Sequence, residues 1–462
     1  MTASKDNDMG TLEGFPSPPA TGCARQSLAS PDNDMGTLEG FPSPPATGCA
    51  RQSLASPTRM LDVLRERGFV QQVSDEPGLA ASLGKGQVTF YAGFDPTAPS
   101  LHVGSMIPLM AMAHLARAGH RPIALLGGGT AMVGDPSGRT ELRQMMTVET
   151  IQENRRSIEP QVRRFVAGES AIIVDNAEWL VPLHYLEFLR DIGRQFSVNR
   201  MLAAEAYRQR LEKGLSFIEF NYQILQAYDF LILYRRYGCT LQVGGDDQWG
   251  NILAGTDLIR RLHQAETYAL TFPLITTAAG AKMGKTAAGA VWLAAERTSP
   301  FDFYQYFINV DDRDVGRFLK LLTFLPMDEI GRLTAREGAE LRTAKQILAY
   351  EVTAIVHGKE AAENAQNAAR AAFGGGGGEL VPTHVVSAAE LSAGLKTVDL
   401  LAAAGLAVSK SAARRLVAQG GVRLGTRKVS SVEDVVQSSE IAGDGTLLHA
   451  GKKHVRRIVV NK

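Results

Sequence analysis

The sequence is poor in cysteine and has no long apolar run, and each shortage argues against a class of protein. Only three of its 462 residues are cysteines, and no two of them form a CxxC pair. This argues against a disulfide framework and a cysteine-built zinc site, and it fits a reducing cytoplasm. No apolar stretch approaches the roughly 18 residues that a membrane helix needs. The N-terminus also lacks the apolar region of a secretion signal, so we expect a cytoplasmic protein that contacts no membrane.

Net charge is nearly absent as well, because 49 basic residues oppose 48 acidic ones and leave +1. That balance excludes a uniformly basic nucleic-acid coat and a solvating acidic protein. It hides a basic end, since residues 392–462 carry twelve basic and five acidic side chains, a local net charge of +7. A local excess of this kind is the electrostatic footprint of a surface that binds a phosphate backbone.

The first 59 residues differ in composition from the rest. Residues 6–31 and 32–57 are identical copies of a 26-residue unit that is rich in Pro, Gly, Ser and Ala. The unit shows no helical or strand period and cannot bury enough apolar surface to offset its chain entropy. We therefore predict a disordered tail over 1–59, with Met60 opening the working protein.

Beyond Met60 the chain alternates apolar, strand-like runs with helical patterns. Strands are expected within 86–94, 122–138 and 239–252, each ending in a glycine-containing turn, and a helix is expected over 104–119. Alternation of this kind predicts an α/β fold with a parallel sheet covered on both faces. In such sheets a ligand binds at the carboxyl ends of the strands, beside these turns.

Two segments have the composition of phosphate-binding sites. In 94–105 a strand end is followed by His102 and Gly104 at the start of a helix, where unpaired N–H groups and a positive dipole end are available. In 281–290 two lysines three positions apart and a threonine stand among glycines and alanines. A structural histidine beside a tight turn explains the first segment equally well, and a solvated basic loop would explain the second.

Polar side chains also interrupt an apolar helix. Over 216–234, Tyr222, Gln226 and Asp229 share one helical face, and such a polar stripe is costly unless something satisfies it. Its partner is either a bound polar ligand or a hydrogen-bond network within the protein. The turn 243–251 adds two acids at a strand end, where acids commonly bind ribose hydroxyls.

In this order the segments resemble a known family. HVGS at 102–105 is similar to the first signature of the class I aminoacyl-tRNA synthetases, usually written HIGH, and KMGKT at 282–286 is similar to the second, KMSKS. With GDPSG, EFNYQILQAYD and LQVGGDDQWGN, they resemble bacterial tyrosyl-tRNA synthetases over about 60–462. Residues 398–429 are similar to the S4-type RNA-binding domain of those enzymes.

The resemblance implies a domain order. After the tail 1–59, it assigns 60–273 to a Rossmann-type catalytic domain, 274–298 to a mobile KMSKS-like loop and linker, and 299–373 to a helical anticodon-side domain. It assigns 374–391, which contains five consecutive glycines, to a flexible linker, and 392–462 to a small α+β S4-like domain.

The resemblance also implies roles for individual residues. Those implied to bind tyrosine are Tyr91 and Asp229 at its phenol, Asp135, Tyr222 and Gln226 at its ammonium, and Gln248 near its carboxylate. Those implied to bind ATP are Gly93, Asp95, His102, Gly104, Ser105, Gly245, Asp247 and Lys285. Those implied to assist catalysis are Thr97, His102, Lys282, Lys285 and Thr286, and those implied to bind tRNA are Lys410, Arg414, Arg415 and Arg423.

The implied activity has two steps. The carboxylate of tyrosine attacks the α-phosphorus of ATP with loss of pyrophosphate, and the tyrosyl group then passes to the 3′ end of tRNA(Tyr). The protein supplies positioning and charge stabilisation, because the attacking carboxylate is already ionised. Magnesium is expected to bind through the ATP phosphates, since the sequence shows no dedicated metal cage. Family members are homodimers, and the helical segment near 180–204 is the expected interface.

Four positions depart from the family pattern. Ser105 replaces the second histidine of the first signature, and Ala92 stands where many members have cysteine. Arg139 stands where some have lysine, and Gly284 replaces the serine of the second signature. Because a serine hydroxyl still donates a hydrogen bond, we expect Ser105 to weaken ATP contacts without abolishing them.

Two other functions remain open. A catalytically inactive RNA-binding protein on the same fold would be expected to lose Lys282, Lys285, His102 or Asp229, and all four are present. The same chemistry on another amino acid, such as tryptophan, is the second alternative. A carboxylate at Asp229 paired with Tyr91 favours a phenol over an indole.

Overall fold

The computed structural model describes residues 60–137, 145–166, 171–203, 207–208, 214–278, 280, 282–286, 289–335, 341–374, 381–451 and 454–461. The predicted disordered tail 1–59 and Arg139 lie outside these residues.

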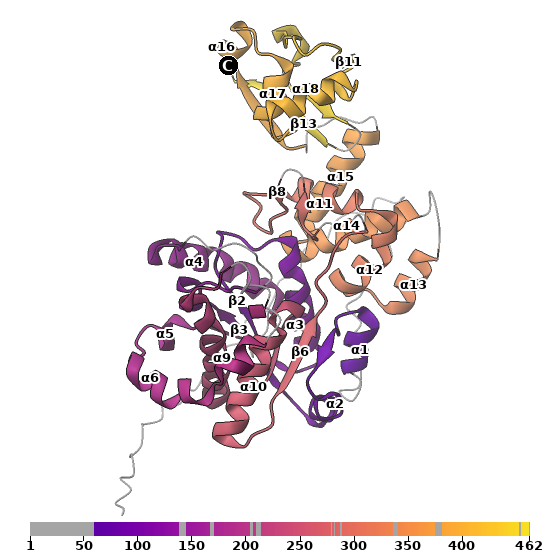
Figure 1. Cartoon of the computed structure of the whole chain (residues 1–462). Helices are drawn as coiled ribbons and strands as arrows, with labels where there is room; N and C mark the ends of the chain where they lie inside the picture. Colours follow the sequence, from indigo (N-terminus) through magenta and orange to yellow (C-terminus); the bar gives the residue numbers. More distant parts are fainter. Residues whose placement is uncertain are drawn as a thin grey trace, which may run out of the picture. The chain divides into compact units, whose positions relative to one another are not determined.

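A six-stranded sheet in the order β1-β6-β5-β2-β3-β4 forms the centre of residues 60–273. Its strands are β1 (Gln72–Val73), β2 (Thr89–Phe94), β3 (Arg121–Leu126), β4 (Ile172–Asp175), β5 (Cys239–Gly245) and β6 (Tyr268–Phe272). Figure 1 labels three of its strands, β2, β3 and β6. The five strands from β6 to β4 pair in parallel, and β1 pairs antiparallel with β6 at the edge. The predicted α/β class with a parallel sheet is confirmed, and the antiparallel edge strand is an addition.

Helices cover both faces of this sheet. On one face α3 (Met106–Arg117) and α4 (Val148–Phe165) pack with Phe90, Ala92 and Phe94 of β2. On the other face α9 (Phe217–Tyr237) and α10 (Trp249–His263) pack with Tyr91. Alternate side chains of β2 therefore enter opposite layers, as the pleat of a strand requires. Shorter helices complete this segment: α1 (Met60–Arg67), α2 (Glu76–Lys85), α5 (Ala177–Leu180), α6 (Tyr185–Asp191) and α7 (Val198–Leu202).

The central helix α9 has strong local signals at both ends. Ser216 caps it by accepting from the Glu219 N–H, and the Glu219 carboxylate accepts from the Ser216 N–H in return. Gly238 ends it in the left-handed conformation, at φ 63°, which glycine adopts without steric cost. The two caps fix the register of the helix, and with it the direction of its polar stripe.

A helical segment follows the sheet, as predicted for 299–373. Its helices are α11 (Pro300–Ile308), α12 (Asp312–Leu322), α13 (Met327–Thr334), α14 (Leu341–His357) and α15 (Lys359–Gly374). Phe318 and Leu319 of α12 lie in the same apolar cluster as Leu109 and Met110 of α3. The helical segment and the six-stranded sheet with its helices therefore share one hydrophobic core.

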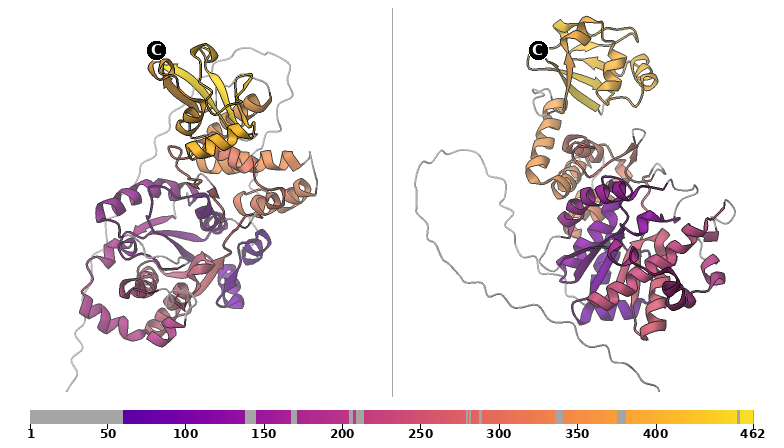
Figure 2. Two further views of the ribbon diagram at one scale, coloured as in Figure 1. Left: turned by 45° about the horizontal axis from the view of Figure 1, so that its top comes forward. Right: turned by 90° about the vertical axis from the view of Figure 1, so that its left-hand side faces the viewer.

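The C-terminal segment, drawn in orange to yellow in Figure 2, has a sheet of its own. This sheet has five strands in the order β11-β10-β12-β13-β9, and the segment has its own apolar core. The strands are β9 (Thr383–Ser387), β10 (Val422–Leu424), β11 (Arg427–Lys428), β12 (Thr446–Ala450) and β13 (His454–Asn461). The helices are α16 (Ala388–Ser392), α17 (Thr397–Ala403) and α18 (Lys410–Ala418). This agrees with the predicted small α+β unit.

The linker predicted over 374–391 is too long and is corrected here. Residues 383–387 form β9, which pairs in parallel with β13, and α16 begins at Ala388. The Val386 side chain is buried in the core of the C-terminal segment, and this apolar burial draws the strand into the sheet. Residues 375–380 lie outside the described part of the chain.

Within the described ranges, none of the helices combines the length and the apolar character needed to cross a membrane.

Candidate active site

A cavity of about 210 Å³ lies at the carboxyl ends of β2 and β5, beside α9. Its lining contains Tyr91, Gly93, Asp95, Thr97, Asp135, Tyr222, Gln226, Asp229, Gly245 and Gln248, all predicted from sequence. The expectation that a ligand site forms at the strand ends is met by this placement.

A carboxylate and a phenol meet in the cavity. Asp229 is 1% exposed, and its two oxygens accept from Trp179 Nε1 at 2.7 Å and Asn176 Nδ2 at 2.9 Å. Burial raises the pKa of Asp229 to about 8, and these two N–H donors act against that rise. Burial also raises the pKa of Tyr91, and the charge of Asp229 adds to the effect.

The Tyr91 hydroxyl is buried and has no hydrogen-bond partner among the described residues. A buried hydroxyl without a partner costs free energy, so a ligand group that bonds to it would gain affinity. Asp229 contributes an acceptor in the same cavity. The pair can therefore recognise a ligand hydroxyl that donates to one group and accepts from the other.

The polar stripe of α9 is satisfied within the protein, which was one of the two explanations left open. Tyr222 Oη donates to Asp95 Oδ2 at 2.9 Å, and Thr130 Oγ1 donates to Asp95 Oδ1 at 2.8 Å. Asn176 Nδ2 lies 3.0 Å from Thr130 Oγ1 and also donates to Asp229. Tyr222 and Asp229 are thus joined through a chain of hydrogen bonds, while both still line the cavity.

A second acid, Asp135, lines the same cavity together with the amides Gln226 and Gln248. Gln248 Nε2 donates to Asp135 Oδ2 at 2.7 Å. Asn251 Nδ2 lies 3.2 Å from the side-chain oxygens of both Gln226 and Gln248. One carboxylate flanked by amide oxygens is a suitable environment for a ligand ammonium group.

Sequence reasoning missed four residues that organise this site: Thr130, Asn176, Trp179 and Asn251. Asn176 and Trp179 follow β4, a four-residue strand that the sequence analysis did not predict. The available signal was the run IIVDN, where an apolar stretch ends in two polar residues. The strand-end reasoning that was used for β3 and β5 would have pointed to the turn after β4 if it had been applied to this run.

Asp95 and Thr97 of the first predicted phosphate-binding segment line the cavity, whereas the His102–Ser105 end of that segment lies against the second segment. His102 and Trp292 form an antiparallel β-bridge, and the Val103 N–H donates to the Val291 carbonyl at 2.9 Å. A Cβ on Gly284 would lie 3.1 Å from Val103, so the second segment touches the first. Gly104 and Ser105 lie in the short turn Val103–Ser105 before α3.

Lys282 is exposed in this second segment, and its charge acts on Asp247. Burial raises the pKa of Asp247, with Asp135 adding to the rise and Lys282 opposing it. The charge of Lys282 therefore reaches the turn after β5. Lys285 and Thr286 lie in the short strand β7 (Lys285–Thr286), which pairs with β8 (Gly289–Ala290), and their side chains lie outside the described part of the structure.

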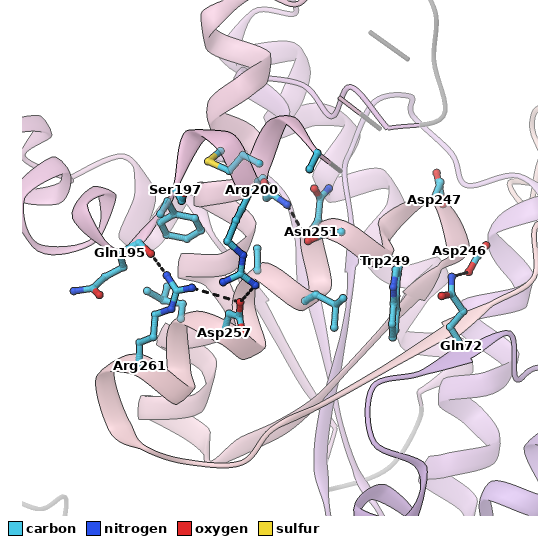
Figure 3. Close-up of a pocket in the computed structure, with 18 of the residues that line it drawn as sticks. Gln72, Gln195, Ser197, Arg200, Asp246, Asp247, Trp249, Asn251, Asp257 and Arg261 are labelled. Carbon is cyan, nitrogen blue, oxygen red and sulfur yellow. Dashed lines mark hydrogen bonds and ion pairs between the residues drawn. The ribbon is translucent and has the colours of Figure 1, made fainter. Parts of the chain in front are cut away.

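A larger hollow of about 680 Å³ adjoins the turn after β5 and contains Asp247 in its lining (Figure 3). Arg200 Nη2 lies 3.0 Å from Asp257 Oδ2, and Arg261 donates to the Gln195 carbonyl. The indole of Trp249 also faces the hollow. Arginines and an aromatic ring in one hollow are suited to a nucleotide.

The four cations predicted to bind RNA are exposed in the C-terminal segment. Lys410, Arg414 and Arg415 lie on α18, and Arg423 lies on β10. Lys410 Nζ is 2.8 Å from Asp399 Oδ1. In the described part of the chain no group of three or more His, Cys, Asp and Glu side chains could hold a metal ion.

The partnerless hydroxyl of Tyr91 leads to a stability prediction. Replacing Tyr91 with phenylalanine removes a buried unpaired group and should raise the free energy of unfolding by about 1 kcal/mol, or leave it unchanged. Tyr222→Phe is the matched control, because it removes the donor to Asp95 and should lower that free energy by about 1 kcal/mol. Urea unfolding of the ligand-free protein measures both. Equal losses in the two variants would contradict the assignment.

Comparisons with known proteins give a consistent result. Residues 84–374 match the family described as tRNA synthetases class I (W and Y), and residues 398–441 match the S4 domain. The tyrosine–tRNA ligase of Clostridium botulinum strain Hall is 51% identical over 407 residues, which cover 87% of this chain and all of that protein. That of Clostridium tetani is 51% identical over 404 residues, covering 87% and 99%.

Among solved structures, a C-terminally truncated mitochondrial tyrosyl-tRNA synthetase of Aspergillus nidulans is similar, with a TM-score of 0.61 and 32% identity. The match covers 67% of this chain and 93% of that one. The corresponding enzyme of Coccidioides posadasii has a TM-score of 0.59 and 33% identity, covering 67% and 91%.

Proposed function

The chain belongs to the tyrosine–tRNA ligases, a family of class I tRNA synthetases, and from this premise we propose how its site performs the reaction. L-tyrosine is first activated by ATP to tyrosyl-adenylate, and the tyrosyl group then passes to the 3′ end of tRNA(Tyr). The observation that carries the proposal is the pairing of buried Asp229 with the partnerless Tyr91 hydroxyl in one cavity.

Asp229 and Tyr91 select the amino acid. The substrate phenol donates to the Asp229 carboxylate and accepts from the Tyr91 hydroxyl. Phenylalanine offers neither bond and would leave both groups buried and unpaired, which is costly. Other residues of the cavity hold the amino acid backbone: Asp135, Tyr222 and Gln226 face the ammonium, and Gln248 lies near the carboxylate.

The first step needs no general base, because the attacking carboxylate is already ionised. It attacks the α-phosphorus of ATP, and the bond to pyrophosphate breaks. Gly93, Asp95, Gly245 and Asp247 are proposed to receive the nucleoside. Lys282 is proposed to stabilise the negative charge that moves onto pyrophosphate.

The remaining proposed ATP contacts come from the two signature segments: Thr97, His102, Gly104, Ser105, Lys285 and Thr286. Magnesium enters as part of the substrate, bound to the ATP phosphates. Its two positive charges would offset the negative charge that builds up on the leaving pyrophosphate.

The second step requires tRNA to reach the adenylate. The exposed cations Lys410, Arg414, Arg415 and Arg423 support phosphate binding by the C-terminal segment, with an affinity that falls as salt rises. The cytoplasm, where tRNA is charged, is the compartment we propose.

ATP–pyrophosphate exchange, run separately with each of the twenty amino acids, tests this proposal. Exchange with tyrosine alone is the expected result. Exchange with tryptophan instead of tyrosine would show that tryptophan, the alternative considered above, is the substrate. Exchange with none, from folded protein that still binds tRNA, would establish the inactive RNA-binding alternative.

A homodimer is the proposed assembly. Among the described residues, six of the eleven exposed large apolar side chains fall in one stretch of the chain, 181–218, which extends beyond the predicted interface 180–204: Val181, Tyr185, Leu186, Val198, Phe217 and Ile218. Leu186 is 78% and Phe217 is 71% exposed. Clustered exposure of this kind marks a protein interface.

The double variant Leu186→Glu, Phe217→Glu should therefore be monomeric, because two charges would be buried unpaired in the interface. Light scattering after size exclusion gives the mass directly. Val408→Glu, at a 59% exposed apolar position in the C-terminal segment, should leave the dimer intact. A monomeric wild-type protein, or a dimeric double variant, would refute the proposed interface.

A further inference from the structure

The segment that carries the second signature is a hairpin, and backbone contacts between residues 275–276 and 282–283 close its base. The Met283 N–H donates to the Ile275 carbonyl at 3.0 Å, and Thr276 forms an antiparallel bridge with Lys282. Farther along, the Val291 N–H donates to the Gly284 carbonyl at 2.7 Å. The position of Lys282 therefore depends on where this base is held.

One side of the base is held by the first signature. The Val103 N–H donates to the Val291 carbonyl at 2.9 Å, and the Leu293 N–H donates to the Leu101 carbonyl at 2.8 Å. Gly284 has φ +77°, and its position leaves 3.3 Å between an added Cβ and the Gly104 nitrogen. A side chain there would push the two signatures apart.

The other side is held by the helical segment through three hydrogen bonds. The Gly284 N–H donates to Tyr306 Oη of α11 at 3.1 Å, and the Ala278 N–H donates to Asp314 Oδ2 of α12 at 2.9 Å. Arg317 Nη1 donates to the Thr276 carbonyl at 3.3 Å. These contacts join backbone atoms of the hairpin to side chains that no step of the proposed reaction uses.

Asp314 is unusual among these contacts because its carboxylate is only 4% exposed. Burying a charge is costly unless hydrogen bonds compensate it. Here one compensating donor is the Ala278 N–H of the hairpin itself. Tyr306 is similar, since burial raises the pKa of its hydroxyl, and the nearby charge of Asp314 adds to that rise.

We propose that Tyr306 and Asp314 are positioning residues for ATP, which fix the hairpin base so that Lys282 stays against the first signature and the turn after β5. The inference rests on the proposed function, since ATP is the ligand that this hairpin serves. It also assigns a route by which the helical segment acts on the activation step, through backbone contacts at residues 276–284.

Tyr306→Phe is the first test, in the full-length protein. Losing one acceptor for the Gly284 N–H should raise KM for ATP in pyrophosphate exchange about fivefold, with KM for tyrosine unchanged. Tyr304→Phe is the matched control, because the Tyr304 hydroxyl on the same helix bonds to Gln366 instead. The control should lose similar stability and leave KM for ATP unchanged. Equal KM values for ATP in both variants would overturn the proposal.

Asp314 provides a second, independent test. Asp314→Ala removes the acceptor for the Ala278 N–H and should also raise KM for ATP, whereas Asp314→Asn keeps an accepting oxygen and should restore most of the affinity. If the alanine variant does not fold, Asp314→Asn and Tyr306→Phe are compared with wild type. The proposal then requires a raised KM for ATP in Tyr306→Phe and a KM near that of wild type in Asp314→Asn. An Asn variant as impaired as a folded Ala variant would contradict the role of this acceptor.

Amide hydrogen exchange tests whether Tyr306 holds the hairpin base, and it does so without an activity assay. Peptides covering 275–286 should exchange faster in Tyr306→Phe than in wild type, and no faster in Tyr304→Phe. Unchanged exchange in Tyr306→Phe would refute the anchor. A wild-type protein that shows no pyrophosphate exchange with any amino acid would instead refute the proposed function, so the two failures are distinguishable.

Discussion

Replacing Asp229 with asparagine is expected to lower kcat/KM for tyrosine by about a thousandfold in pyrophosphate exchange. The carboxylate can accept from Asn176 and Trp179 and still accept from the substrate hydroxyl. An asparagine has one accepting oxygen, and its NH₂ group would oppose one of the two existing donors. Above pH 8, where Asp229 is ionised, the asparagine also lacks the negative charge that strengthens all three bonds.

KM for ATP should change little in this variant, because Asp229 lies at the phenol end of the cavity. Asp328→Asn is the control: it removes an exposed carboxylate of α13 that pairs with Arg332 and lies outside both cavities. Its exchange kinetics for tyrosine should match wild type. An Asp229→Asn variant with kcat/KM within tenfold of wild type would contradict the assigned role.

Replacing Lys282 with alanine is expected to reduce kcat for adenylate formation by about a hundredfold, the usual effect of removing one charge-stabilising group from a reaction centre. The Lys282 side chain is exposed in the signature hairpin, and its charge acts on Asp247. Negative charge moves onto pyrophosphate as the reaction proceeds, so the lysine contributes more in the transition state than in the bound substrate. KM for tyrosine should therefore remain near its wild-type value.

Lys359→Ala is the matched control, since Lys359 is an exposed lysine at the start of α15. Neither substitution should change the midpoint of urea unfolding appreciably, because exposed side chains contribute little to stability. Single-turnover formation of the adenylate measures the step directly. A Lys282→Ala variant as fast as Lys359→Ala would show that the hairpin acts through other groups.

The parts of the fold with strong local patterns could be predicted from the sequence. The helix α9 has a capping box, a glycine C-cap and a polar stripe of period 3.6, and its predicted range 216–234 matches Phe217–Tyr237 closely. The strands β2, β3 and β5 each end in a glycine-containing turn, which made both their type and their carboxyl ends recognisable.

Short strands were harder to recognise, and part of the site was lost with them. β4 has four residues and β6 has five, too few for a periodic signal to separate a strand from a short buried helix. Asn176 follows β4, so its bonds to Asp229 and Thr130 could not be anticipated. The strand β9 was missed because the glycine run before it suggested a longer linker, whereas its pairing with β13 depends on residues about 70 positions away.

Residues 60–273 and 299–373 follow one another in the sequence as two segments. Their buried side chains nevertheless form one continuous apolar core. Cooperative loss of that interior removes both segments together. An inherited substitution that loosens α12 would therefore shorten the lifetime of the activating site, although it touches no substrate. Substitutions in helices remote from the cavity can thus make tyrosine activation temperature-sensitive. The C-terminal segment buries most of its apolar side chains in a core of its own, so it could unfold alone and leave the first step intact.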